Sequence, residues 1–150
     1  MIAFILLSNY VFAQNYRGAE LRTKDDFLYG KFEVRYKPAQ GDGLVSSFFT
    51  YNTDYGNTPW NEIDIEILGR WDDIISMNTI TPGQSSHLRE SFVKDLSAHT
   101  QYHDYAFEWT PNYVAWFVDG KEYYRQDLPS HSYIATLKHP QKINFLKCRT

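Results

Sequence analysis

Three carboxylic acids stand at alternate positions within residues 60–67, and an isoleucine follows each of them. The acids are Glu62, Asp64 and Glu66, and the isoleucines are Ile63, Ile65 and Ile67. Successive side chains of a β-strand point to opposite faces, so a strand here would place all the acids on one face and all the isoleucines on the other. Neighbouring acids would lie about 7 Å apart at Cα. Like charges this close disfavour simultaneous ionisation, so at least one carboxyl should keep its proton to unusually high pH.

This arrangement suits glycoside hydrolysis with retention of configuration. Such an enzyme uses one ionised carboxylate to attack the anomeric carbon and one protonated carboxyl to donate to the leaving oxygen, the two groups being about 5–5.5 Å apart. Glu62 and Glu66 would lie about 13 Å apart at Cα, so their side chains would have to lean toward each other, with Asp64 between them to hold a shared proton. Carboxylate clusters also bind hard cations, so metal binding is an alternative. A solvated acidic strand face is another alternative, which the poor strand propensity of acidic residues disfavours.

The strand that carries these acids must pair with other strands in a sheet, and the sequence predicts several of them. Apolar and charged residues alternate with period 2 in several short runs, and Asp119-Gly120 is a strong signal for a hairpin turn. The predicted strands are residues 31–37, Leu44–Tyr51, 105–109, Tyr113–Val118 and 121–125, and turn clusters separate them at 40–43, 52–59 and 81–86. No run of about ten residues has helical periodicity. The pattern predicts an all-β fold, a sandwich or jelly roll.

The amino-acid composition of the chain limits the kinds of molecule that it could bind. The 150 residues suit one domain, and the net charge of −3 comes without a block of basic residues, which argues against nucleic-acid binding. The high aromatic content of 17% suits strands and the apolar faces of sugars. Cys148 is the only cysteine, so no disulfide can form within the chain. Residues 1–13 are either a cleaved signal peptide or a buried first strand, and their apolar run is too short to cross a membrane.

At the acidic strand the sequence resembles a known family. The segment Glu62-Ile63-Asp64-Ile65-Glu66 resembles the signature of glycoside hydrolase family 16. Further blocks follow in family order, and the resemblance covers residues 16–143. These blocks are Gly-Ala-Glu-Leu-Arg at 18–22, Tyr-Gly-Lys-Phe-Glu-Val-Arg at 29–35, Val-Ser-Ser-Phe-Phe-Thr-Tyr at 45–51, Pro-Trp-Asn at 59–61, His-Asp-Tyr-Ala-Phe-Glu-Trp at 103–109 and residues 114–120.

The resemblance implies a concanavalin-like β-jelly roll that cleaves or transfers β-glucans. The five-residue spacing of the acids is similar to that of lichenases and of xyloglucan and fungal wall transglycosylases. The neighbouring blocks look most like bacterial lichenases, which cut mixed-linkage β-1,3-1,4-glucan. The resemblance therefore implies retaining endo-hydrolysis of β-glucan. The alternatives are a transglycosylase and an inactive remnant that only binds glycans.

Residue roles carried over from the family concern nine positions. Glu62 matches the nucleophile, Glu66 the general acid/base and Asp64 an auxiliary carboxylate. Six others match cleft residues that contact sugar: Glu20, Arg22, Phe49, Tyr51, Trp60 and Asn78.

Four of these six have a plainer interpretation. Phe49 and Tyr51 can be ordinary strand aromatics, and Arg22 can be a surface partner of Glu20. His99 and His103 have the spacing of metal ligands on a helix, but they precede a strand and lack companion ligands. We interpret them as structural.

Departures from the family pattern lie mainly at the two ends. Ile80 replaces a common aromatic, residues 144–150 diverge from the expected Asn-Leu-Trp block, and the strands that usually precede Gly18 are missing. Sandwich domains of this kind run to roughly 200–250 residues. We therefore expect a partial domain over 16–143, truncated at both ends, with a divergent tail. The resemblance implies no cofactor, and the usual site of a structural calcium would be missing. We expect a secreted or periplasmic monomer whose partner is a β-glucan.

Overall fold

The computed structural model describes residues 18–52, 56–84 and 90–149. Residues 1–13, predicted as a signal peptide or a first strand, lie outside the described residues. Ten β-strands and one short 3₁₀ helix form in the described part of the chain. They are β1 (Gly18–Arg22), β2 (Gly30–Tyr36), β3 (Leu44–Tyr51), β4 (Glu62–Leu68), β5 (Ile74–Ile80), β6 (Glu90–Phe92), β7 (His103–Trp109), β8 (Tyr113–Val118), β9 (Lys121–Asp127), η1 (Ser132–Thr136) and β10 (Lys142–Arg149).

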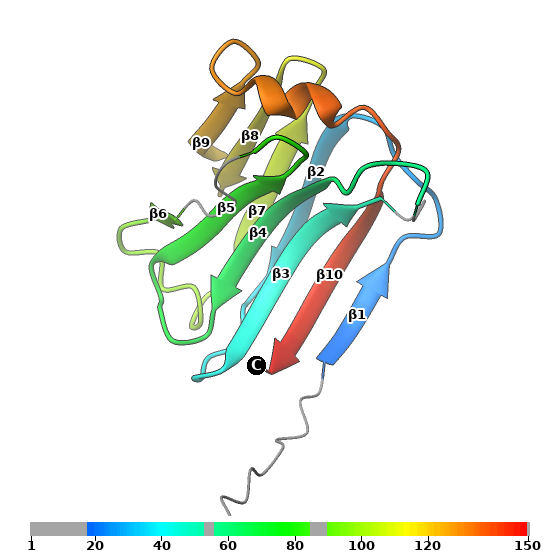
Figure 1. Cartoon of the computed structure of the whole chain (residues 1–150). Helices are drawn as coiled ribbons and strands as arrows, with labels where there is room; N and C mark the ends of the chain where they lie inside the picture. Colours follow the sequence, from blue (N-terminus) through cyan, green and yellow to red (C-terminus); the bar gives the residue numbers. More distant parts are fainter. Residues whose placement is uncertain (1–17, 53–55, 85–89, 150) are drawn as a thin grey trace, which may run out of the picture.

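The strands form two antiparallel sheets packed face to face (Figure 1). The larger sheet has the order β1-β10-β3-β4-β5-β6, and the smaller has the order β2-β7-β8-β9. The predicted all-β jelly-roll sandwich is confirmed. No helix in the described ranges is long and apolar enough to cross a membrane. Residues 144–149, which the sequence analysis assigns to a tail, belong to β10 and lie between β1 and β3.

The strands predicted from period-2 patterning are found within two residues of their predicted ends. In β2 the charged side chains of Lys31, Glu33 and Arg35 are exposed, while Phe32, Val34 and Tyr36 turn toward the other sheet. The β8–β9 hairpin turns at the predicted Asp119-Gly120 pair, both with positive φ, 49° and 78°. These angles are those of a tight two-residue turn that matches the twist of the flanking strands.

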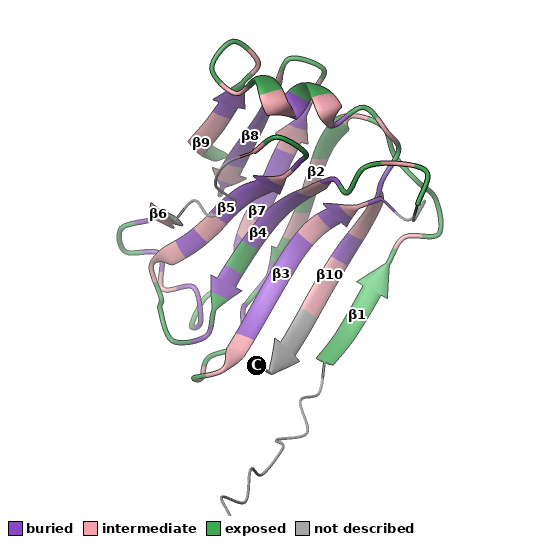
Figure 2. Cartoon of the chain, in the orientation of Figure 1, coloured by how far each residue is buried: buried purple, intermediate pink, exposed green. Residues whose placement is uncertain are grey.

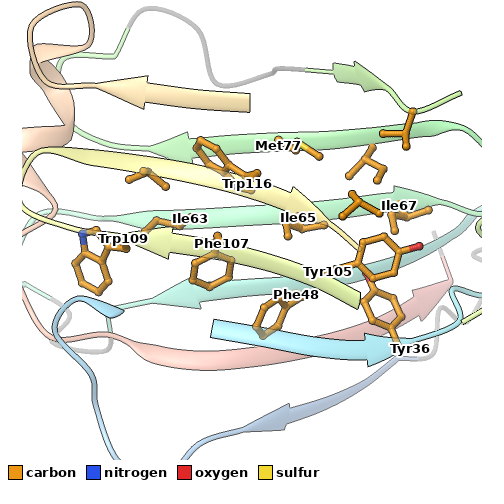
Figure 3. Close-up of a cluster of buried hydrophobic side chains, with 14 of the residues drawn as sticks. Tyr36, Phe48, Ile63, Ile65, Ile67, Met77, Tyr105, Phe107, Trp109 and Trp116 are labelled. Atoms are coloured by element: carbon orange, nitrogen blue, oxygen red, sulfur yellow. The ribbon is translucent and has the colours of Figure 1, made fainter. Parts of the chain in front are cut away.

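The core fills the space between the sheets and includes the isoleucine face of β4 (Figure 3). Ile63, Ile65 and Ile67 are fully buried, as the alternation predicts. Aromatic rings from the two sheets meet there, for example Phe48 and Phe107, whose centroids lie 5.0 Å apart. Figure 2 shows that burial is concentrated in the central strands and is absent from β1.

Two side chains bind the backbone of β4 directly. The Trp116 indole on β8, in the opposite sheet, donates a 2.8 Å hydrogen bond to the backbone carbonyl of Asp64. The backbone N–H of Ile63 donates to Thr50 Oγ1 at 3.0 Å. Both contacts are buried, so β4 is held by hydrogen bonds in addition to its apolar packing.

The end of β4 is clamped by a close backbone contact. The Gly41 N–H donates to the Gly69 carbonyl at 2.9 Å, and the Gly69 N–H donates to the Leu44 carbonyl at 2.8 Å. A Cβ atom added to Gly69 would lie 2.4 Å from the Gly41 carbonyl oxygen and 2.8 Å from that of Ala39. Only glycine fits this approach without movement of the backbone.

We therefore expect Gly69→Ala to lower the free energy of unfolding by about 1–3 kcal/mol, the usual effect of forcing atoms into a packed site. Thermal and urea unfolding would measure the change. Gly83→Ala is the matched control, because a Cβ at Gly83 meets no atom within 4 Å and the substitution strains only a positive φ of 83°. An effect no larger than that of the control would contradict a steric clamp at Gly69.

Candidate active site

The predicted site residues gather on the outward face of the larger sheet. Residues directly opposite each other in an antiparallel pair point to the same face. Asp64 lies opposite Phe49 on β3 and opposite Asn78 on β5, and Asn144 on β10 lies on the other side of Phe49. Arg22 on β1 lies opposite Asn144 and completes a row across five strands.

The neighbouring rows carry the other two acids. Glu62 lies opposite Tyr51, and Glu66 lies opposite Ser47. The row of Glu66 ends at Glu20 on β1, through Leu146 on β10. The register thus brings eight of the nine predicted site residues onto one face of the sheet. The ninth, Trp60, precedes β4 and contacts Glu62 through its side chain.

The three carboxyls differ in their exposure and partners. Asp64, in the middle, is 7% exposed, Glu62 is half-buried, and part of the Glu66 side chain reaches solvent. The Trp60 indole Nε1 donates to Glu62 Oε2 at 2.7 Å. Trp60 itself is 59% exposed and meets the Tyr51 ring edge to face at 6.1 Å between centroids. Two aromatic side chains, one of them mostly exposed, therefore adjoin Glu62.

Burial raises the pKa of all three acids. Desolvation, opposed by the hydrogen bond from Trp60 and reinforced by the negative charge of Glu66, raises the pKa of Glu62 to about 7. Burial, followed by the charges of Glu62 and Glu66, holds the pKa of Asp64 well above its usual range. Burial also raises the pKa of Glu66, and a hydrogen bond from Ser47 opposes it. The directions agree with the expectation that at least one of the three carboxyls keeps its proton to unusually high pH, but the main cause at each of them is desolvation and not the charge of its neighbours.

The glutamate–arginine pair of β1 has a third member. Arg22 donates to Glu20 Oε1 from Nε at 2.9 Å and from its terminal nitrogen at 2.7 Å, which is the ion pair that the plainer interpretation expected. Arg22 Nε also donates to Asn144 Oδ1 at 2.9 Å, and Asn144 is 1% exposed. The pair is therefore oriented by a buried amide on the next strand.

Sequence reasoning missed Asn144 and Ser47 as members of this face. The alternation of β3 could have found Ser47, because it shares a face with Phe49 and Tyr51. Asn144 gave no local signal, since its role depends on the pairing of β10 with β1.

The two histidines lie elsewhere and do not approach each other as ligands. His99 Nε2 lies 3.0 Å from the Trp71 carbonyl, and His103 Nδ1 lies 2.7 Å from Asp119 Oδ2 in the β8–β9 turn. Across the described ranges, no three His, Cys, Asp or Glu side chains are placed to hold a metal ion.

Comparison with known proteins agrees with this geometry. The model of glycosyl hydrolases family 16 matches residues 7–148. A xylanase/β-glucanase of Ruminococcus flavefaciens is 44% identical over 116 residues, 76% of this chain and 14% of that protein. A β-glucanase of Bacillus amyloliquefaciens is 46% identical over 103 residues, 68% of this chain and 42% of that protein. The chain thus spans less than half the length of these curated relatives.

A solved structure has a similar fold. It is a prokaryotic β-1,3-1,4-glucanase (lichenase) derived from a mouse hindgut metagenome, 43% identical with a TM-score of 0.73, and the match covers 87% of this chain and 57% of that one. Together with the family match over nearly the whole sequence, this settles the classification. The chain belongs to glycosyl hydrolases family 16.

Proposed function

We propose that this chain is a retaining β-glucan hydrolase that cuts mixed-linkage β-1,3-1,4-glucan. The observation that carries the proposal is the group of three acids with raised pKa values on the outward face of β4, beside exposed Trp60. Retaining glycosidases require two carboxyls that differ in protonation at the same pH. The lichenase likeness supports the choice of glucan.

In the first step of the proposed reaction, an ionised Glu62 oxygen attacks the anomeric carbon as the bond to the leaving sugar oxygen breaks. Glu66 donates its proton to that oxygen, and a covalent glycosyl–Glu62 ester forms. The Trp60 N–H stabilises the ionised form of Glu62, which burial disfavours. Asp64, buried between the two glutamates, keeps a proton that it can share with either of them.

In the second step, the now ionised Glu66 takes a proton from water. The water oxygen attacks the anomeric carbon and the bond to Glu62 breaks, so that the two steps together retain the configuration of the sugar. A sugar hydroxyl in place of water would give transglycosylation by the same steps. The ratio of hydrolysis to transfer, measured at high acceptor concentration, distinguishes the two outcomes.

The sugar-contacting residues divide by chemistry along the same face. Trp60, Tyr51 and Phe49 offer ring faces to pyranose rings, while Arg22 and Asn78 offer hydrogen-bonding groups to hydroxyls. Because these side chains come from β1, β3, β5 and the segment just before β4, a glucan chain that reaches all of them would lie across the strands.

The first test of the proposal is Glu62→Gln. A neutral amide cannot act as the nucleophile, so we expect kcat on barley β-glucan to fall at least roughly 10³-fold, with a melting temperature no lower than that of the wild type. Glu20→Gln is the matched control on the same face, and it should affect KM more than kcat. Near-normal turnover by purified Glu62→Gln would contradict the assignment of Glu62 as the nucleophile.

A second prediction concerns the acidic limb of the pH profile of kcat/KM, which reports ionisation of the free enzyme. Trp60→Phe keeps an aromatic ring but removes the N–H that favours ionised Glu62, so the limb should move to higher pH. Glu20→Gln, on β1 at the far end of the row of Glu66, is the control and should leave the limb in place. An unchanged limb in Trp60→Phe would mean that Glu62 does not control it.

A third prediction follows from the buried Asp64. Because its pKa is higher in the folded than in the unfolded state, its carboxyl stabilises the fold below about pH 4 and loses that contribution as pH rises through the folded pKa. Asp64→Asn should therefore raise the free energy of unfolding at pH 7 by about 1–3 kcal/mol and flatten its dependence on pH, while activity falls. Urea unfolding between pH 4 and 8 measures this. A variant less stable than wild type at pH 7 would contradict the prediction.

A further inference from the structure

Trp60 gives the proposed site an N–H donor and an exposed ring, although it lies just before β4 and outside the strand ladder. Its indole Nε1 donates to Glu62 Oε2 at 2.7 Å, and its ring meets Tyr51, yet the residue is 59% exposed. The rotamer of a side chain depends on its local φ and ψ angles, so an exposed indole keeps one orientation best on a fixed backbone. The residues on either side of Trp60 must supply that constraint.

The peptide groups on both sides of Trp60 are held by two asparagine side chains. On the preceding side, the Pro59 carbonyl accepts from Asn52 Nδ2 at 2.8 Å and from Asn61 Nδ2 at 3.2 Å. On the following side, the Asn61 backbone N–H donates to Asn52 Oδ1 at 3.0 Å. Asn52 is 5% exposed and Asn61 is fully buried, so both are withdrawn from bulk water. Because φ and ψ are the only soft dihedrals of a residue, fixing both flanking peptide planes fixes the backbone of Trp60.

The two asparagines are anchored on different parts of the fold. Asn52 directly follows β3, and Asn61 directly precedes β4. Asn61 also reaches η1, where its Nδ2 donates to the Thr136 carbonyl at 3.2 Å and its Oδ1 accepts from Thr136 Oγ1 at 3.2 Å. The next residue of η1 is held from the smaller sheet, because the Trp109 indole on β7 donates to the Leu137 carbonyl at 3.1 Å. The segment before β4 is thus tied to both sheets through side chains.

We propose that Asn52 and Asn61 are positioning residues, which hold the Trp60 indole on Glu62 and the Trp60 ring where a sugar can stack. The sugar contact rests on the proposed function, whereas the position of the indole does not. The alternative is a purely structural role, since buried amides also satisfy the backbone of irregular segments. In that case the loss of an asparagine would destabilise the fold but leave Trp60 on Glu62 in the molecules that remain folded.

The indole N–H signals in the proton–nitrogen NMR spectrum of the full chain test this. The chain has four tryptophans, and Trp60→Phe identifies the signal of Trp60. An N–H bound to a carboxylate makes a short, strong hydrogen bond, which moves its proton signal downfield. We expect Asn52→Ala and Asn61→Ala each to move the Trp60 signal upfield, toward its position in Glu62→Ala. The signal of Trp116, which is bound in the core, should stay in place and report the intact fold.

Thr136 provides a milder pair of variants that leaves both asparagines present. Thr136→Val removes the hydroxyl that binds Asn61 Oδ1, and Thr136→Ser keeps it. We expect Thr136→Val to move the Trp60 signal in the same direction as Asn61→Ala but by less, and Thr136→Ser to leave it in place. Asn112→Ala, at an exposed asparagine between β7 and β8, is the control for loss of an amide.

A Trp60 signal that stays in place in folded Asn52→Ala and Asn61→Ala would overturn the proposal and make both asparagines structural. Where an alanine variant does not fold, the Thr136 pair decides, and equal Trp60 signals in its two members would overturn the proposal.

These readouts need no turnover, so they stand even if the hydrolase assignment fails. If the assignment holds, kcat/KM for β-glucan should fall at least about ten-fold in Asn52→Ala, because small misplacements near reacting atoms are costly. The same constant should be unchanged in Asn112→Ala. A displaced indole with unchanged kcat/KM would contradict the role of Trp60 in the proposed reaction, and would leave the positioning of the indole supported.

Discussion

Strand β4 must satisfy two opposite environments at once, and the rest of the structure depends on this constraint. Its isoleucine face is fully buried, and its other face carries three carboxyls. Burial of three isoleucines contributes about 5–9 kcal/mol. Each unit by which burial raises a carboxyl pKa opposes folding by about 1.4 kcal/mol above that pKa. Burial of the isoleucine face therefore offsets part of the cost of holding the acids in a partly desolvated site.

The fold keeps this strand from relaxing in several ways. Trp116 reaches from the opposite sheet to the Asp64 carbonyl, and Thr50 binds the Ile63 N–H. The glycine contact at Gly69 closes the end of the strand. A strand anchored on its inner side keeps its three carboxyls in the partly desolvated site, and desolvation is the main cause of their raised pKa values.

The two glutamates share a strand face but have different hydrogen-bond donors. Glu62 accepts from the Trp60 indole, and Glu66 accepts from Ser47. Both donors oppose the effect of burial, and the charge of Glu66 additionally raises the pKa of Glu62. Local differences of this kind separate the protonation of neighbouring acids, which chemistry with a nucleophile and an acid requires.

The sequence by itself determined the features that depend on alternation over a few residues. It predicted the separation of acids from isoleucines in β4, the strands β2, β3, β7, β8 and β9, the Asp119-Gly120 turn and the family. Only the tertiary structure decided which strands are neighbours. It placed β10 between β1 and β3 and so joined Arg22 to Asn144 across 122 positions. Burial likewise depends on the whole sandwich, so the main cause of the raised pKa of Glu66 could not be found in the strand pattern. Local patterns select the faces of a strand, whereas register and desolvation are properties of the assembled sheets.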